Sequence, residues 1–212
     1  VFTTQQMSRL ALSFLHQTEL NTKTRLFMSV WHGIYKRELI EKLHLRFYSE
    51  REVLSEDLPF QIEFFKNAQS VKFIPDYLYT YCLNACSLTH NFKLNKFNAA
   101  INLRKLLYNI IPNHTDASYF IDIEFYGRIR YLLADLILAN NISFKEKQKF
   151  IRELCKKKEW NKLNISQGYQ EYTWKYMKQY ELLKANRSTC LTLFILFDKY
   201  INKRNFKKLL KK

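Results

Sequence analysis

The sequence predicts an α+β protein that is mainly helical, and three observations lead to this prediction. Of the 212 residues, 16% are aromatic, whereas glycine and proline number only three each. This balance favours long helices over the turn-rich layout of an all-β protein. After about residue 93, apolar side chains recur at helical spacing. Before that point, two short segments are rich in β-branched and aromatic residues, which is typical of strands.

Three helices are predicted in the first part of the chain. The first covers residues 3–17, where apolar side chains follow a threonine that can cap the helix. The second covers residues 31–43, with Gly33 as a weak point near its start. The third covers residues 56–67, and Ser55 is expected to cap it.

Two strands are predicted next, over residues 71–74 and 77–82, joined by a turn at Pro75-Asp76. We therefore expect residues 1–92 to form a mixed α and β part and residues 93–212 to form a helical part. The helices expected in the second part cover 95–111, 117–139, 144–158, 167–185 and 188–204.

The net charge of +16 is distributed unevenly along the chain. Residues 1–92 hold 10 lysines and arginines against 9 acids, a net charge of +1, whereas residues 93–212 hold 25 against 10, a net charge of +15. Such an asymmetry is typical of a surface that meets a polyanion, either anionic lipid, nucleic acid or a phosphorylated substrate. The charge itself does not choose among these. The five histidines and four cysteines have no metal-ligand spacing, so we predict no zinc site.

Three short blocks occur in a fixed order: WHGIYKREL at 31–39, SEDLPF at 55–60 and SLT at 87–89. Their order and distances resemble those of bacterial family 2 (GT-A type) glycosyltransferases. The resemblance covers about residues 25–92. It implies the C-terminal, acceptor-side half of a GT-A domain over residues 1–92, followed by a basic helical appendage over residues 93–212.

The resemblance implies that Asp57 is the catalytic base and that Glu56 orients the site or binds acceptor. A general base needs an ionised carboxylate within hydrogen-bond reach of the acceptor hydroxyl. Without the resemblance, both residues are acids in a first helical turn, where the helix dipole favours them.

Four further residues are candidate substrate contacts: Trp31, Tyr35, Arg37 and His90. Trp31 and Tyr35 could offer flat apolar faces to a sugar ring, and the alternative is that they are core aromatics. Arg37 could contact a diphosphate or lie solvated on its helix. His90 could contact donor phosphate or simply be a surface histidine.

The family's N-terminal half has no counterpart in this sequence, which has neither the opening strand and turn nor a D-x-D metal motif. We therefore expect the nucleotide-sugar donor and a divalent cation, Mg²⁺ or Mn²⁺, to have their ligands outside this chain. The chain begins with Val1 and has no basic-then-apolar leader, so we expect Val1 to be an internal position of a longer protein. Gly33 is a second departure, because it stands where the family often has lysine.

The function expected is sugar transfer from a nucleotide-diphosphate sugar to the hydroxyl of a glycan or lipid-linked acceptor, in cell-surface polysaccharide synthesis. We expect a cytoplasmic location, with the basic helices against the anionic inner face of the cell membrane. The alternative for the basic tail is a solvated one. The alternative function is a basic aromatic module that binds nucleic acid, with Trp160 and Trp174 stacking on bases, or that binds a protein partner.

Overall fold

The computed structural model describes residues 11, 15, 29–74, 76, 78–80, 82, 94–111, 115–165 and 174–209. The chain forms two compact units, Val1–Phe125 and Tyr126–Lys212. Helix α6 (Thr115–Leu138) contributes its first part to unit 1 and its second part to unit 2. The boundary expected near residue 93 divides the chain by its charge and by the proposed catalytic role of its first part, and this division stays a prediction.

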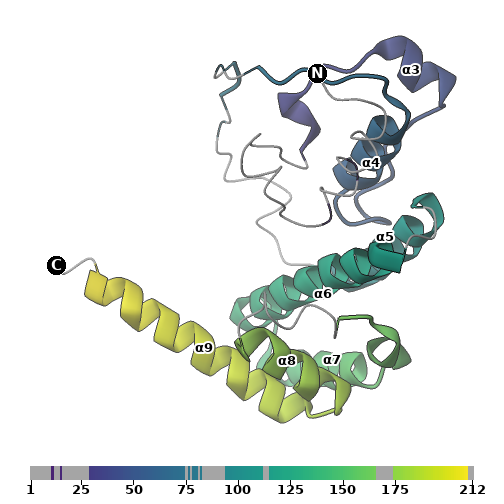
Figure 1. Ribbon diagram of the computed structural model, residues 1–212. Coiled ribbons are helices and arrows are strands. Elements are labelled where there is room, and N and C mark those ends of the chain that lie inside the picture. Colours follow the sequence, from purple (N-terminus) through teal and green to yellow (C-terminus); the bar gives the residue numbers. More distant parts are fainter. Residues whose placement is uncertain are drawn as a thin grey trace. The chain divides into compact units, whose positions relative to one another are not determined.

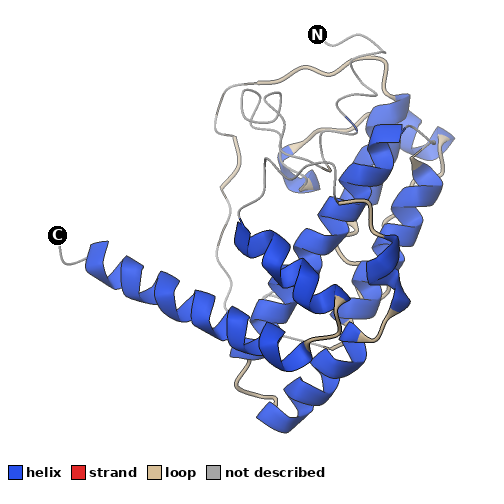
Figure 2. Cartoon of the chain, turned by 60° about the horizontal axis from the view of Figure 1, so that its bottom comes forward, coloured by secondary structure: helices blue, strands red, loops and turns tan. Residues whose placement is uncertain are grey.

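All the regular elements in the described residues are helices, as Figure 2 shows. The α+β prediction is therefore wrong, and so is the expectation of half a GT-A domain, because no strand occurs at 71–74, 78–80 or 82. Val71 and Phe73 are half-buried and pack against the core of unit 1, whereas Lys72 and Ile74 are exposed. The alternating pattern is thus satisfied by an extended segment that packs on helices. A strand also needs a hydrogen-bonding neighbour, which side-chain alternation does not supply.

Unit 1 is built on helices α4 (Asp57–Asn67) and α5 (Lys96–Ile110), which lie against each other in Figure 1. Their apolar side chains form one buried cluster, to which α4 contributes Leu58, Ile62 and Phe65 and α5 contributes Leu103 and Leu107. Burying such side chains stabilises the fold by about 1.5–3 kcal/mol each. The cluster fixes one face of α4 and so positions the other residues of that helix.

A buried ion pair joins α5 to the first part of α6. Arg104 contacts Oδ1 of Asp122 at 2.7 Å, and the Tyr108 hydroxyl donates to the same oxygen at 3.0 Å. Asp122 is fully buried. Burial and the Asp122 charge raise the pKa of Tyr108 to about 12, so this hydroxyl keeps its proton and remains a donor.

The helix expected over residues 31–43 is two shorter pieces, η1 (Val30–His32) and α3 (Arg37–Lys42). Gly33 between them is extended, with φ −120° and ψ 155°. A Cβ at Gly33 would come within 2.7 Å of the Tyr35 hydroxyl oxygen. The helix is interrupted because Tyr35 folds back over Gly33 toward α4.

Helix α4 was expected to be capped by Ser55, and this detail is also wrong. The N-cap residue is Glu56, without a side-chain capping hydrogen bond, and Ser55 has a positive φ of 58°. The predicted α4 is otherwise confirmed to within a residue.

Unit 2 contains α7 (Phe144–Cys155), η3 (Lys158–Lys162), α8 (Trp174–Lys184) and α9 (Ser188–Leu209). Helix α9 packs against both α7 and α8. The helices predicted over 95–111, 117–139, 144–158 and 188–204 are confirmed, with their ends shifted. The helix predicted over 167–185 is confirmed from Trp174 onward, and residues 166–173 lie outside the described part.

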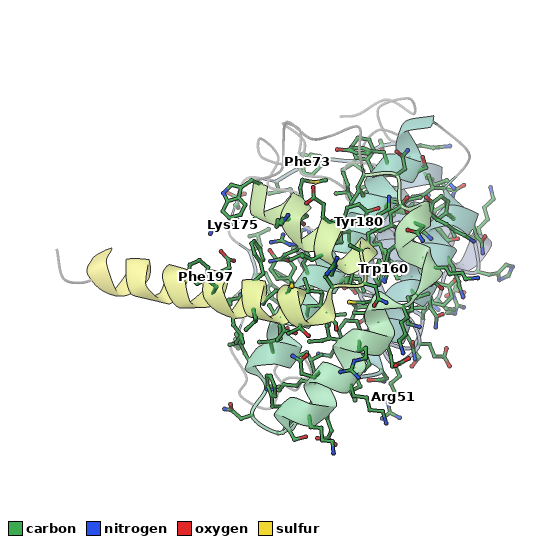
Figure 3. The ribbon with its side chains drawn as sticks, turned by 90° about the horizontal axis from the view of Figure 1, so that it is seen from below. Arg51, Phe73, Trp160, Lys175, Tyr180 and Phe197 are labelled. Carbon is green, nitrogen blue, oxygen red and sulfur yellow. The ribbon has the colours of Figure 1, made fainter. Side chains whose placement is uncertain are left out.

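Buried aromatic side chains hold unit 2 together by hydrogen bonds to backbone carbonyls. Trp160 Nε1 donates to the Leu154 oxygen at 2.7 Å, and the Tyr180 hydroxyl donates to the Trp160 oxygen at 2.8 Å. Figure 3 shows Trp160 and Tyr180 in this position. No helix among the described residues is long and apolar enough to cross a membrane.

Candidate functional site

Asp57 is the first residue of α4 and is half-buried. Its Oδ2 accepts a hydrogen bond of 3.3 Å from the backbone N–H of Val30, the first residue of η1. The free amides and the dipole at a helix N-terminus favour a carboxylate there. The start of α4 and the backbone of η1 together fix where this carboxylate lies.

Gln61 lies one turn after Asp57, on the same face of α4. Its Nε2 donates to the Tyr35 hydroxyl at 2.7 Å and to the Ser29 carbonyl at 3.3 Å. Gln61 is only 1% exposed, and its Oε1 has no hydrogen-bond partner in the part of the chain that the structure describes. A buried amide oxygen without a partner is costly.

Tyr35 is half-buried, and its ring packs edge-on against Phe60 and Phe64 at centroid distances of 5.6 and 5.0 Å. Burial raises the pKa of Tyr35 to about 12, the hydrogen bond from Gln61 acts against the rise, and the Asp57 charge adds to it. The hydroxyl is therefore protonated at neutral pH. Because it accepts from Gln61, its own proton is directed to another acceptor.

His32 also belongs to the surroundings of Asp57. Desolvation lowers the pKa of His32, while a backbone hydrogen bond with Ser29 and the Asp57 charge act in the opposite direction. A lowered pKa leaves the imidazole neutral at pH 7. Sequence reasoning missed both His32 and Gln61. The signal for Gln61 was present, since it is an amide one turn after the E-D pair on an otherwise apolar helix.

Glu56 precedes Asp57 as the N-cap residue of α4. Burial raises the pKa of Glu56, and the nearby charges of Asp57 and Glu50 raise it further, although a backbone hydrogen bond opposes this. Two adjacent acids therefore have different surroundings, and Glu56 holds its proton to a higher pH than an ordinary glutamate does.

Trp31, in the middle of η1, is 42% exposed. Its ring stacks on Tyr79 at 4.6 Å with an interplanar angle of 29°, and it meets His32 edge-on at 5.4 Å. The ring therefore lies at the surface beside the segment that holds Asp57, and not in the core.

Arg37 and His90 are the remaining candidates. Arg37 begins α3, is exposed, and acts electrostatically on Glu41 of its own helix. The preceding Lys36 pairs with Glu38 at 2.9 Å on the surface. His90 lies outside the described residues.

A metal site is not formed by the described residues, which contain no group of three or more His, Cys, Asp and Glu side chains placed to hold an ion. The surroundings of Asp57 offer two adjacent carboxylates, those of Asp57 and Glu56, with a tyrosine, an amide and an imidazole. Among the described residues this donor set does not gather the three or more ligands of an ion site. It does fit the binding of a hydroxyl and the removal of its proton.

The comparisons with known proteins give one partial similarity. No protein-family profile matches the sequence, and no solved structure matches the chain. About a third of the chain is similar to a glycosyltransferase, so the chain is related to a glycosyltransferase over that length.

The relative is the uncharacterized glycosyltransferase EpsJ of Bacillus subtilis (strain 168), which is 40% identical over 67 residues. The match covers 32% of this chain and 19% of that protein, so the matched part spans about one fifth of the relative's length.

Proposed function

We propose that this chain is the acceptor-side part of a glycosyltransferase that moves a sugar from a nucleotide-diphosphate sugar to the hydroxyl of a glycan or lipid-linked acceptor. The observation that carries the proposal is the Asp57 carboxylate, held at the start of α4 by the Val30 N–H and lying one turn before the buried Gln61. The order of the three sequence blocks and the partial similarity to a glycosyltransferase support the same function.

In this proposal Asp57 is the general base. The acceptor oxygen forms a bond to the anomeric carbon of the donor while its proton passes to Asp57. The bond between that carbon and the nucleotide diphosphate breaks, and the diphosphate leaves with the bonding electrons. General-base catalysis of this kind contributes about 10²–10⁴-fold to a rate.

The neighbours of Asp57 have supporting roles in the proposal. Tyr35 offers its hydroxyl proton to a hydroxyl group of the acceptor, and the buried Gln61 holds the Tyr35 hydroxyl in position. Trp31 offers its half-exposed ring to a sugar face, and Glu56 orients the site. In this proposal Arg37 and His90 contact the donor, and the ligands of a divalent cation are residues other than the described ones.

The nucleic-acid alternative loses one of its expected stacking residues. Trp160 is 1% exposed and its indole N–H is engaged by the Leu154 carbonyl, so its ring is unavailable to a base. Trp174 is 68% exposed and remains available.

The test of the proposed function is sugar transfer by the complete enzyme with Asp57→Asn. The control is Glu146→Gln, which changes another acid in a first helical turn, where Glu146 forms a capping box with Ser143 in α7. A base predicts a large loss of transfer for Asp57→Asn alone. Equal activity of the two variants would remove Asp57 from the mechanism.

A further inference from the structure

Helices α8 and α9 leave an open apolar groove on the surface of unit 2. The groove has a volume of about 750 Å³ and is lined mainly by leucine and phenylalanine side chains, among them Leu182, Leu193, Leu196 and Phe197. Leu193 and Phe197 are 62% and 63% exposed. Exposed apolar side chains grouped in this way mark a surface that binds another apolar surface.

One basic side chain lines this groove, and the segment that forms the groove is rich in basic residues. Lys178 forms part of its wall. Residues 174–212 hold 11 lysines and arginines against two acids, a net charge of +9. Both acids are engaged, since Glu181 pairs with Lys178 and Asp198 pairs with Lys175. The segment that contains α8 and α9 is therefore strongly basic.

The same side of α9 changes from apolar to basic along the helix. Helix α9 continues to Leu209, and positions 204, 207 and 208 come 11 residues after Leu193, Leu196 and Phe197. An interval of 11 residues returns to nearly the same side of an α-helix. These positions are Arg204, Lys207 and Lys208. Figures 1 and 3 show α9 extending past α8, with Phe197 labelled on it in Figure 3.

From this pattern we infer that the α8–α9 groove and the C-terminal part of α9 form a docking face for an anionic phospholipid bilayer. Leu193, Leu196 and Phe197 enter the boundary between headgroups and acyl chains, and the basic positions meet the lipid phosphates. Interfacial helices bind by this combination of apolar area and electrostatic attraction to anionic lipid. The long stem of Lys178 can lie along the apolar wall while its ammonium group reaches the headgroups.

Charge and chemistry favour a bilayer over other occupants of the groove. A second copy of the chain would bring two strongly positive faces together. A nucleic acid would use the basic positions and could stack a base on Phe197, but it would gain nothing from Leu193 and Leu196, which offer neither a ring nor a hydrogen bond. The docking face does not depend on the chemistry assigned to Asp57.

The experiment measures binding of the full chain to sedimented vesicles. Phosphatidylcholine vesicles with about 30% phosphatidylglycerol should retain the chain at low salt and release it as salt rises, and neutral vesicles should retain little. Leu193→Ser/Phe197→Ser should weaken retention about tenfold or more. The matched control is Leu138→Ser/Phe144→Ser, because these side chains are 54% and 67% exposed in the same unit.

A second pair of variants tests where the charge acts. Arg204→Gln/Lys207→Gln/Lys208→Gln should weaken retention roughly tenfold or more, since each lysine or arginine near an anionic surface is worth about 1 kcal/mol. Lys145→Gln/Lys149→Gln/Arg152→Gln removes three exposed charges from α7 and should leave most binding intact.

Four results would overturn the inference. The first is failure of the unchanged chain to bind anionic vesicles, and the second is an equal loss of vesicle retention in the test and control variants. The third is a dimer on gel filtration that is lost when Leu193 and Phe197 are replaced. The fourth is oligonucleotide binding that needs these two residues. An unchanged melting temperature in each variant shows that the fold is retained.

Discussion

The backbone N–H of Val30 donates a hydrogen bond to the Asp57 carboxylate across 27 positions of sequence. This contact joins the Trp31 block of the sequence to the E-D block. The two blocks therefore meet in space at the start of α4, where Gln61 adds hydrogen bonds to Ser29 and Tyr35. The position of the Asp57 carboxylate therefore depends on the geometry of these hydrogen bonds.

Asp57→Asn should reduce sugar transfer by the complete enzyme about 10²–10⁴-fold. The amide oxygen of asparagine can still accept from the Val30 N–H, so the melting temperature should change little. Loss of a favourable charge at a helix N-terminus costs only about 0.3–1 kcal/mol. Kinetics and thermal unfolding of the same preparation measure both quantities.

Glu56→Gln is the neighbouring control for Asp57→Asn. It removes one acid from the same turn but leaves the proposed base intact, so the fall in kcat should be milder. Wild-type turnover by Asp57→Asn would show that the E-D pair is only a helix start.

Gln61→Leu should lower the free energy of unfolding by about 1–3 kcal/mol, because the Ser29 carbonyl and the Tyr35 hydroxyl lose their donor inside the protein. In the complete enzyme it should also raise KM for the acceptor, because the Tyr35 hydroxyl loses the hydrogen bond that positions it. Urea unfolding and acceptor titration measure these effects.

Asn67→Leu serves as the comparison for Gln61→Leu, since Asn67 is an exposed amide at the end of the same helix. It should change stability by less than about 0.5 kcal/mol and leave KM unchanged. If Gln61→Leu altered stability but never KM, Gln61 would have a structural role only.

The positions of the helices were predicted well from the sequence, whereas the structure of the segments between them and their packing were not. The segments that became α4, α5, α6, α7 and α9 each carry a long apolar repeat, and such a repeat determines a helix almost by itself. Residues 71–74 also have the alternation of a strand, but pairing depends on a neighbour that a local pattern does not contain.

The site was predictable only where a block of sequence pointed to it. Asp57 and Tyr35 belong to such blocks and lie close to the same glutamine, whereas Gln61 lies just outside a block and gained its place through long-range contacts with Ser29 and Tyr35. His32 belongs to the first block, but its relation to Asp57 is also long-range. Arg37 also belongs to a block, but the break at Gly33 starts a new helix and places Arg37 on an exposed surface. The short separation between Trp31 and Arg37 in the sequence did not show that the chain leaves its helical path at Gly33.

The stability of the chain should fall as pH rises from about 10 to 12, and Tyr35 should contribute to this fall. Burial raises the pKa of Tyr35 from 10.0 to about 12, so folding favours its protonated form. The stability it contributes is therefore complete below pH 10 and is lost as pH rises toward 12. The urea concentration at the unfolding midpoint should decline less steeply with pH, from pH 8 to about 12, for Tyr35→Phe than for the unchanged chain. Tyr131→Phe changes an exposed tyrosine, so its urea midpoint should decline with pH as steeply as that of the unchanged chain. An equally steep decline for Tyr35→Phe would contradict the contribution of Tyr35.

Gly33→Ala should destabilise the chain by about 1–3 kcal/mol, because the added methyl group would lie 2.7 Å from the Tyr35 hydroxyl oxygen and 2.8 Å from the ring carbon that bears it. The ring cannot easily yield, since it is packed against Phe60 and Phe64 and bonded to Gln61.

The clash is separated from any general effect of alanine at this position by a double-mutant cycle with Tyr35→Ala. Removing the ring removes the obstacle, so Gly33→Ala should destabilise the chain far less in that background, and the coupling free energy should be about 1 kcal/mol or more.

Gly127→Ala is the matched glycine control. Its added methyl group would meet only the end of the Tyr176 side chain, at 3.1 Å. Alanine is also more favourable than glycine in the interior of α6, by about 1 kcal/mol. Thermal unfolding should therefore show a lower melting temperature for Gly33→Ala and an equal or higher one for Gly127→Ala. Additive costs of Gly33→Ala and Tyr35→Ala would mean that Tyr35 does not fold back over Gly33, and the position of its hydroxyl beside Gln61 would have to be abandoned with it.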